Sequence, residues 1–360
     1  MKRLVSLLLC LAMMLCLFGC NVTGSNGSPV PDDGVGGGGN NSSDLPNGEG
    51  GGNAPTVKMQ YNVVTGLEDI PEGSPTRPIG IMLANDLRAR PQGGIDEADM
   101  LIEIEYQAGT TRFISIFGSA DKVPNVNPIR SARSPMVQVA QAMGLVYVHA
   151  GGSEPALNLI ATSDIDNLNA GNYYEDCFWY DDDLYELRGA VEYTYTTNKD
   201  GLKKPLEQLG YDTAPIRDMP FTFGTVFGGE AANVAEIRLS YGLHSTFVYD
   251  AETGLYTKYI GDASSAEQHT ALNGNPVRVN NVIALYGYQY YEWNNVTMNY
   301  DFTGGYGKLI SGGYARDVRY ELDTEGFTIY EMDGSVAKVS RGKTYISFAS
   351  DLWEDDLNIA

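Results

Sequence analysis

The segment from Asn21 to Thr56 divides the chain, because it cannot form a hydrophobic core. Eleven of its 36 residues are Gly, none is aromatic, and Asn, Ser, Asp and Pro fill most other positions. Such a composition buries too little apolar surface to offset the entropy lost on ordering. We therefore expect residues 20–57 to form a disordered tether with a root-mean-square span of roughly 30–35 Å. Folding is confined to the residues that follow, about 300 in number, which suffice for two domains with a core each.

The tether is preceded by a sequence that is typical of an exported lipoprotein. A short basic segment leads into an apolar run from Leu4 to Phe18, which is shorter than the roughly 20 residues that a membrane-spanning helix needs. The run ends in Leu17-Phe18-Gly19-Cys20, where a small residue precedes a cysteine, and only Phe18 is bulkier than usual for a lipoprotein signal. We expect residues 1–19 to be cleaved and Cys20 to carry the lipid. The lipid on Cys20 would then anchor the protein at the outer face of the cytoplasmic membrane.

Charge and cysteine content exclude several classes of function. The formal net charge is −22, and cleavage of the signal removes two basic residues and no acid, which leaves −24. A chain this acidic repels nucleic acids at long range, so we expect no nucleic-acid partner. Only Cys177 remains beyond Cys20, which rules out an intramolecular disulfide and a multi-cysteine zinc site. We expect Cys177 to pack as a small apolar side chain, and we expect no metal or cofactor.

Two patterns of predicted secondary structure follow each other along the folded part. Strand-like runs at residues 79–83, 100–106, 113–117 and 145–149 are interleaved with helices that begin at Ser134 and Glu154. This alternation predicts an α/β domain over residues 59–230, with a mixed sheet and some parallel pairing. After about residue 235 the pattern changes to strand-like runs at 246–249, 256–260, 282–293, 327–330 and 336–339, the last two around an Asp333-Gly334 turn. We predict a smaller β-rich domain over residues 235–350, with the boundary between Phe227 and Glu236.

One basic segment stands out in this acidic chain. Between Tyr106 and Ser153 there is a single acid and the formal charge is +3, carried mainly by Arg, the side chain best suited to pair with phosphate or carboxylate. The segment continues through two predicted helix starts and a glycine turn, which are favourable places for anions. We predict that an anion-binding site on one concave surface is formed by Arg112, Arg130, Arg133, His149, Gly151, Gly152 and Ser153.

Other interpretations of these residues remain open. The arginines could pair with acids such as Asp99, Glu103 or Glu105, and His149 could be a core histidine. If the site is functional, the protein is a binding module for an anionic or phosphorylated envelope glycan or wall fragment. It could instead be a hydrolase or transferase of such polymers with His149 as acid or base, although no Gly-x-Ser-x-Gly motif is present. A third alternative is a scaffold that binds a protein partner through the Tyr-rich β domain.

Residues 172–186 combine aromatic side chains with acids, including Asp181 to Asp183. This mixture could form a sugar platform or part of a Ca²⁺ site, but it lacks the spacing of an EF-hand. A solvated loop over the edge of an aromatic core is the simpler interpretation.

Several motifs together resemble the YerB-like family of bacterial lipoproteins. They are Arg77-Pro78-Ile79-Gly80-Ile81-Met82, Ala89-Arg90-Pro91-Gln92-Gly93-Gly94, Thr111-Arg112-Phe113, Pro128-Ile129-Arg130-Ser131-Ala132-Arg133, His149-Ala150-Gly151-Gly152-Ser153, Asn281-Val282-Ile283 and Gly342-Lys343-Thr344. The resemblance covers the chain after the tether and implies two tandem domains of unknown function behind a lipoprotein signal. The family carries Pro-His-Asn after an arginine, whereas Arg188 is followed here by Gly189-Ala190-Val191. The resemblance implies no particular activity.

Overall fold

The computed structural model describes residues 58–172, 177–226 and 228–360, so the predicted signal, Cys20 and the tether lie outside the described residues. Residues 58–360 form one compact unit. Its first part contains β1 (Met59–Tyr61), β2 (Glu68–Pro71), β3 (Ile79–Ala84), β4 (Met100–Gln107), β5 (Thr110–Phe117), α2 (Ser134–Ala142), β6 (Val146–His149), α3 (Glu154–Thr162), β7 (Asn167–Asn169), β8 (Trp179–Tyr180), α5 (Asp182–Arg188), β9 (Tyr195–Thr196) and α6 (Lys199–Leu209).

The second part consists almost entirely of strands. They are β10 (Thr222–Phe223), β11 (Glu230–Ala231), β12 (Val234–Ser240), β13 (Leu243–Asp250), β14 (Leu255–Ile260), β15 (Glu267–Gln268), β16 (Arg278–Val279), β17 (Asn281–Gly287), β18 (Gln289–Tyr291), β19 (Met298–Tyr300), β20 (Gly305–Ser311), β21 (Tyr314–Leu322), β22 (Phe327–Glu331), β23 (Lys338–Val339), β24 (Thr344–Ser350) and β25 (Asn358–Ile359). The predicted fold class, an α/β region followed by a β-rich region, is confirmed.

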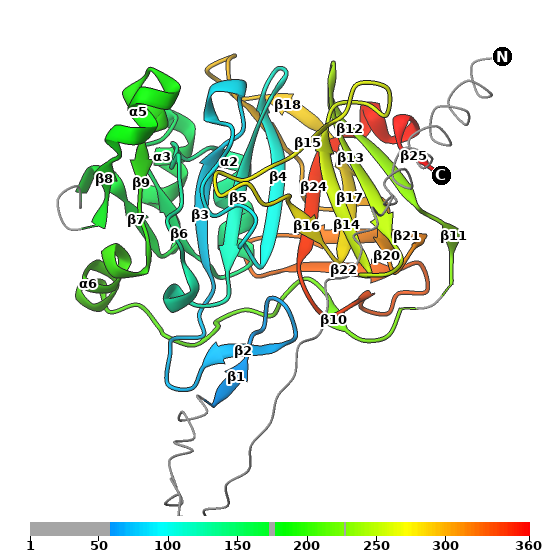
Figure 1. Ribbon diagram of the computed structural model, residues 1–360, viewed down its shortest axis with the longest axis horizontal. Helices are drawn as coiled ribbons and strands as arrows, with labels where there is room; N and C mark the ends of the chain where they lie inside the picture. Colours follow the sequence, from blue (N-terminus) through cyan, green and yellow to red (C-terminus); the bar gives the residue numbers. More distant parts are fainter. Residues whose placement is uncertain (1–57, 173–176, 227) are drawn as a thin grey trace, which may run out of the picture. The chain divides into compact units, whose positions relative to one another are not determined.

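A single 11-stranded sheet runs through both regions in the order β11-β21-β20-β17-β24-β4-β5-β3-β6-β7, with β22 added on β21. The junction is made by β24, which pairs in parallel with β17 on one side and with β4 on the other. In Figure 1 the red β24 lies beside the cyan β4, although the two strands are far apart in sequence. The α/β region and the β-rich region therefore share one sheet. Both β24 and β4 are buried along nearly their whole length, so each needs a partner at both edges.

The two faces of this sheet form two cores, and each core draws on both regions. One face packs against a second sheet of six strands, β15-β14-β13-β12-β25 with β16 on β14, and includes Ile81, Phe247 and Tyr345. The other face packs against α2 and includes Met136 and Ile346. The expectation that each domain has its own core is wrong, because the two regions share one sheet and therefore its two faces.

Most of the local predictions agree with the structure. The runs that begin at residues 79, 100 and 113 are β3, β4 and β5, and the two predicted helices are α2 and α3. The run at 282–293 is interrupted, because β17 ends at Gly287 and β18 begins at Gln289. Cys177 is buried, as expected for a packing residue. In the part of the chain that the structure describes, no helix combines the length and the apolar character needed to cross a bilayer.

Candidate functional site

The predicted arginines gather around two tyrosine rings. The guanidinium groups of Arg112 and Arg133 lie over the ring of Tyr106, with their central carbons 4.4 and 4.8 Å from its centre. Arg130 lies 5.0 Å from the ring centre of Tyr193 and donates to the carbonyl oxygen of Glu192 at 3.0 Å. We call Arg112, Arg130 and Arg133 the arginine cluster. The sequence did not indicate the two tyrosines, because neither the strand-like run that ends at Tyr106 nor the segment around Tyr193 carries a pattern that points to contact with a cation.

The arginine cluster forms no ion pair in the part of the chain that the structure describes. Within residues 58–172, 177–226 and 228–360, none of the ion pairs involves Arg112, Arg130 or Arg133. Their hydrogen bonds go to backbone carbonyls instead, from Arg112 to Ser131 and from Arg133 to Ala132. The Nε atoms of Arg130 and Arg133 are buried and have no hydrogen-bond partner. This leaves unused donors on two cationic side chains.

The acids considered as partners are bound elsewhere. Asp99 pairs with Lys122 at 2.8 Å. Glu103 pairs with Lys258 at 3.4 Å in a fully buried position. Glu105 accepts hydrogen bonds from the backbone of Gly109 and from Ser240 and Gln289. The interpretation that these acids neutralise the arginines is therefore wrong.

The arginines of the cluster repel one another. Burial, together with the neighbouring charges of Arg133 and Arg130, lowers the pKa of Arg112 to about 10. Burial also lowers the pKa of Arg133. Like charges held together in a buried setting cost free energy unless an anion meets them. Arg112 itself is buried, whereas Arg130 and Arg133 are half-buried and reach the surface.

The loop that carries the cluster lies beside the glycine turn, as predicted. The amide of Ala132 donates to the carbonyl of Gly151 at 2.9 Å, and the amide of Ser153 donates to Ala132 at 3.2 Å. Ser153 caps α3 by accepting from the amide of Ala156. Ser134, in contrast, does not cap α2. Arg133 occupies that position without a side-chain capping bond, so the first amides of α2 add partial positive charge beside the cluster.

His149 does not belong to an open site. It is completely buried, its Nδ1 lies 2.8 Å from the carbonyl oxygen of Gly151, and its Nε2 lies 3.4 Å from Oδ1 of Asn167. Its ring stacks on Tyr147. Burial lowers the pKa of His149, which favours the neutral form. The alternative of a core histidine therefore describes this residue. The amides of Gly151 and Ser153 are also not free donors, because Gly151 donates to Asn169 and Ser153 donates to Ala132.

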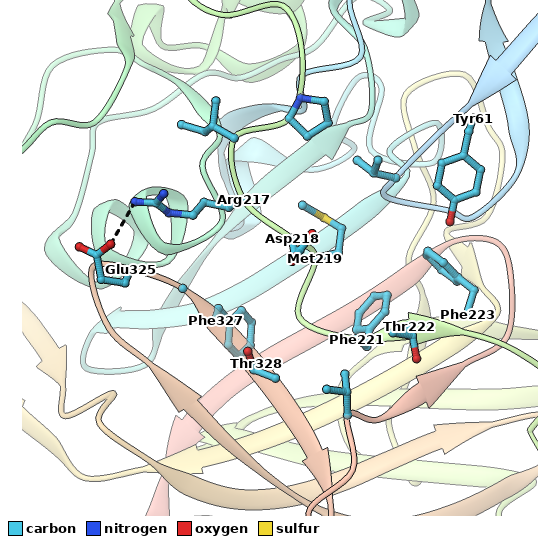
Figure 2. Close-up of a pocket in the computed structure, with 15 residues that line it drawn as sticks. Tyr61, Arg217, Asp218, Met219, Phe221, Thr222, Phe223, Glu325, Phe327 and Thr328 are labelled. Carbon is cyan, nitrogen blue, oxygen red and sulfur yellow. Dashed lines mark ion pairs between the residues drawn. The ribbon is translucent and has the colours of Figure 1, made fainter.

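Another cavity lies away from the arginine cluster and is lined in part by aromatic side chains. It has a volume of about 840 Å³ and is bounded by β1, by the segment before β10 and by β22. Figure 2 shows Phe221, Phe223 and Phe327 around it, and an ion pair between Arg217 and Glu325 at its edge, 3.7 Å long. Phe221 and Phe327 are buried core residues. The cavity has no cluster of reactive side chains, and no sequence prediction pointed to it.

Residues 172–186, which combine aromatic and acidic side chains, form no ion site among the residues that the structure describes. Residues 173–176 lie outside the described residues. Asp181 accepts from the amide of Leu184 and so caps α5, and Asp182 and Asp183 occupy the first turn of this helix. Acids in these positions stabilise a helix N-terminus, which accounts for the acidic run without a metal.

Comparison with known proteins identifies relatives over the same regions. Residues 64–212 match the family model "Protein of unknown function (DUF3048) N-terminal domain", and residues 235–346 match the corresponding C-terminal domain. A protein of Bacillus subtilis (strain 168) described as "Putative lipoprotein YerB" is 26% identical over 304 residues, which cover 82% of this chain and 88% of the relative. The crystal structure of the YerB protein from Bacillus subtilis has a TM-score of 0.70 and 25% identity, covering 84% of this chain and 99% of that chain. The resemblance inferred from the motifs is confirmed.

Proposed function

The chain belongs to the DUF3048 family, and we propose that it is a lipid-anchored envelope protein that binds anionic groups of a cell-envelope polymer through its arginine cluster. The relative in Bacillus subtilis bears the name of a lipoprotein, which supports the lipid anchor at Cys20. The proposed ligand carries phosphate or carboxylate groups, because Arg forms paired hydrogen bonds with both.

One observation carries the proposal: among the described residues the arginine cluster forms no ion pair, in a chain with 46 acids and only 24 basic residues. In so acidic a chain a cation would ordinarily pair with a carboxylate, and Glu292, which acts on Arg133, does so without an ion pair. The half-buried side chains of Arg130 and Arg133 reach the surface, and the uncapped start of α2 adds to the positive potential at this place. Together these features suit an anion that approaches from solvent.

The enzyme alternative is less favoured by the geometry. An acid–base residue needs access to its substrate and a free ring nitrogen. His149 has neither, since it is buried and both of its ring nitrogens have partners. A binding module needs only the positive donors, which are present.

The test compares binding of phosphorylated wall fragments with binding of the same fragments after their phosphate has been removed. The unlipidated chain, residues 21–360, should bind the phosphorylated form more tightly. Arg130→Ala and Arg133→Ala should each weaken this binding by roughly 10–100-fold, since a charge-assisted hydrogen bond contributes about 1.5–3 kcal/mol. Equal binding of both fragments, or full affinity in both variants, would contradict the proposal.

Arg319→Ala provides a matched control. Arg319 also lies over a tyrosine ring, that of Tyr330 at 4.2 Å, but it is paired with Glu321 at 2.6 Å. Its charge is already neutralised, so its removal should leave binding of the phosphorylated fragments unchanged.

A further inference from the structure

A groove rich in tyrosine lies between the β18–β19 hairpin and α2. It has a volume of about 500 Å³ and is lined by Tyr288 and Tyr290 on one side and by Gln138 and Gln141 of α2 on the other. The two tyrosine rings are nearly parallel, with centres 6.3 Å apart and 24° between their planes. Tyr288 is 63% exposed and Tyr290 is 41% exposed, so their faces are open to a ligand.

The chemistry of this groove is that of a sugar-binding surface. The face of an aromatic ring carries partial negative charge and attracts the C–H edges of a pyranose ring. Amide and carboxylate side chains supply several acceptors and donors for hydroxyl groups. Gln138, Asp301 and Asp323 provide such groups around the rings. The carboxylate of Asp301 is kept ionised, because hydrogen bonds from Thr303 lower its pKa.

The acidic side chains that line the groove favour an uncharged part of a ligand over an anionic one. Among the residues that line it, none is basic and two, Asp301 and Asp323, are acidic. A phosphate or carboxylate would be repelled there, whereas a sugar ring with free hydroxyls would not.

The groove and the arginine cluster are connected through helix α2. Gln138 of α2 donates to Asn299 of β19 at 2.9 Å, which holds the hairpin along the helix whose first residue follows Arg133. Gln138 lies five residues beyond Arg133, or about 7.5 Å along a helix axis. At the end of β18, Glu292 is close enough to Arg133 to act on its titration, although the two form no ion pair. The hairpin therefore spans the distance between the groove and the cluster.

We propose that Tyr288 and Tyr290 form a subsite for sugar rings of the same anionic glycan whose phosphate or carboxylate groups bind the arginine cluster. The anionic part of this inference rests on the proposed function, whereas the sugar subsite stands on its own geometry. The ligand is thus a glycan with charged groups spaced along neutral sugar rings, and neither a sugar-free polyanion nor a protein.

Three probes separate the two sites on the unlipidated chain, residues 21–360. They are phosphorylated wall fragments, the same fragments without phosphate, and inorganic polyphosphate, which has no sugar. Tyr288→Ala and Tyr290→Ala should each weaken binding of both glycan probes by about tenfold, which corresponds to one stacking contact at a binding hot spot. Neither variant should change the affinity for polyphosphate. Arg133→Ala should weaken binding of the phosphorylated fragments and of polyphosphate only.

Tyr306→Ala is the matched control, because Tyr306 on β20 is 58% exposed and does not line the groove. It should leave all three affinities unchanged. If the tyrosine variants bind the glycan probes like the control, or lose polyphosphate affinity to the same extent, the sugar subsite is wrong while the arginine site survives. If the wild-type chain binds dephosphorylated fragments but not polyphosphate, the subsite is supported and the proposed function fails. Binding of none of the three probes would overturn both.

Discussion

The buried pair of Glu103 and Lys258 offers a sharp test of how the two sheets are held together. Both side chains are 1% exposed, and their charged atoms are 3.4 Å apart. Glu103 lies on β4 of the large sheet, and Lys258 lies on β14 of the second sheet. Glu103 also accepts hydrogen bonds from Asn85, Thr111 and Tyr345 at 2.7–2.8 Å. The pair therefore lies at the centre of a polar network inside the sandwich.

We expect Lys258→Met to destabilise the protein by about 3–5 kcal/mol, because it leaves a buried carboxylate without its cation. The Coulomb attraction lost at this distance, taken with an effective dielectric constant of about 20, is about 5 kcal/mol and agrees with that range. A carboxylate without its partner is relieved by protonation, so the loss should be smaller at pH 5 than at pH 7. Adding Glu103→Gln removes the charge and should restore most of the stability, since the hydroxyls of Thr111 and Tyr345 can turn to suit an amide.

Urea unfolding of residues 21–360 at both pH values measures these differences. Lys308→Met is the control, because Lys308 and Asp317 form a surface pair at 2.7 Å that should contribute no more than about 1 kcal/mol. A loss in Lys258→Met as small as in the control would refute the reasoning. A double variant that stays as unstable as Lys258→Met would show that the loss comes from packing rather than from charge.

Two further predictions concern titration and export. His149 and His269 are both fully buried and burial lowers both pKa values, so below about pH 6.5 the unfolded chain takes up protons that the folded chain does not. Stability should fall by about 1.4 kcal/mol per histidine between pH 7.5 and 5.5, and His149→Gln should remove about half of this dependence in urea titrations; an unchanged slope would contradict it. Cys20→Ala should release the protein from the membrane fraction of expressing cells, whereas continued retention in that fraction would overturn lipidation at Cys20.

The sequence predicted the local elements well because their signals are local. The apolar run that forms the buried strand β4 and the Ser153 cap of α3 are set by neighbours within a few positions. The partners of a strand edge are not encoded in this way. Nothing in residues 344–350 states that β24 joins β4, over 200 residues earlier, to β17. Patterns along the sequence therefore could not predict that one sheet runs through both regions.

The candidate site was predictable in its charges but not in its side-chain directions. The excess of arginine over acids in residues 106–153 indicated a basic segment, and the structure brings Arg112, Arg130 and Arg133 of this segment together, whereas anion binding by them stays a prediction. His149 was misplaced, because a residue at the carboxyl end of a strand can face the ligand or the core, and its ring stacks inward on Tyr147. The sequence also could not place Tyr288 and Tyr290 beside α2, since that contact depends on Gln138 and Asn299, which are over 150 residues apart.

The distribution of acids explains why the arginine cluster persists in so acidic a protein. Asp99 and Glu103 are each held in a buried network by a lysine, Lys122 and Lys258, and these networks join segments that are distant in sequence. Moving either acid towards the arginines would leave a lysine buried without its anion, at a cost of several kcal/mol. The fold thus uses Asp99 and Glu103 for its own cohesion, and Arg130 and Arg133 remain half-buried at the surface without an ion pair among the described residues. The proposed binding of an anionic envelope polymer builds on this arrangement, because such a polymer would supply the missing counter-charge.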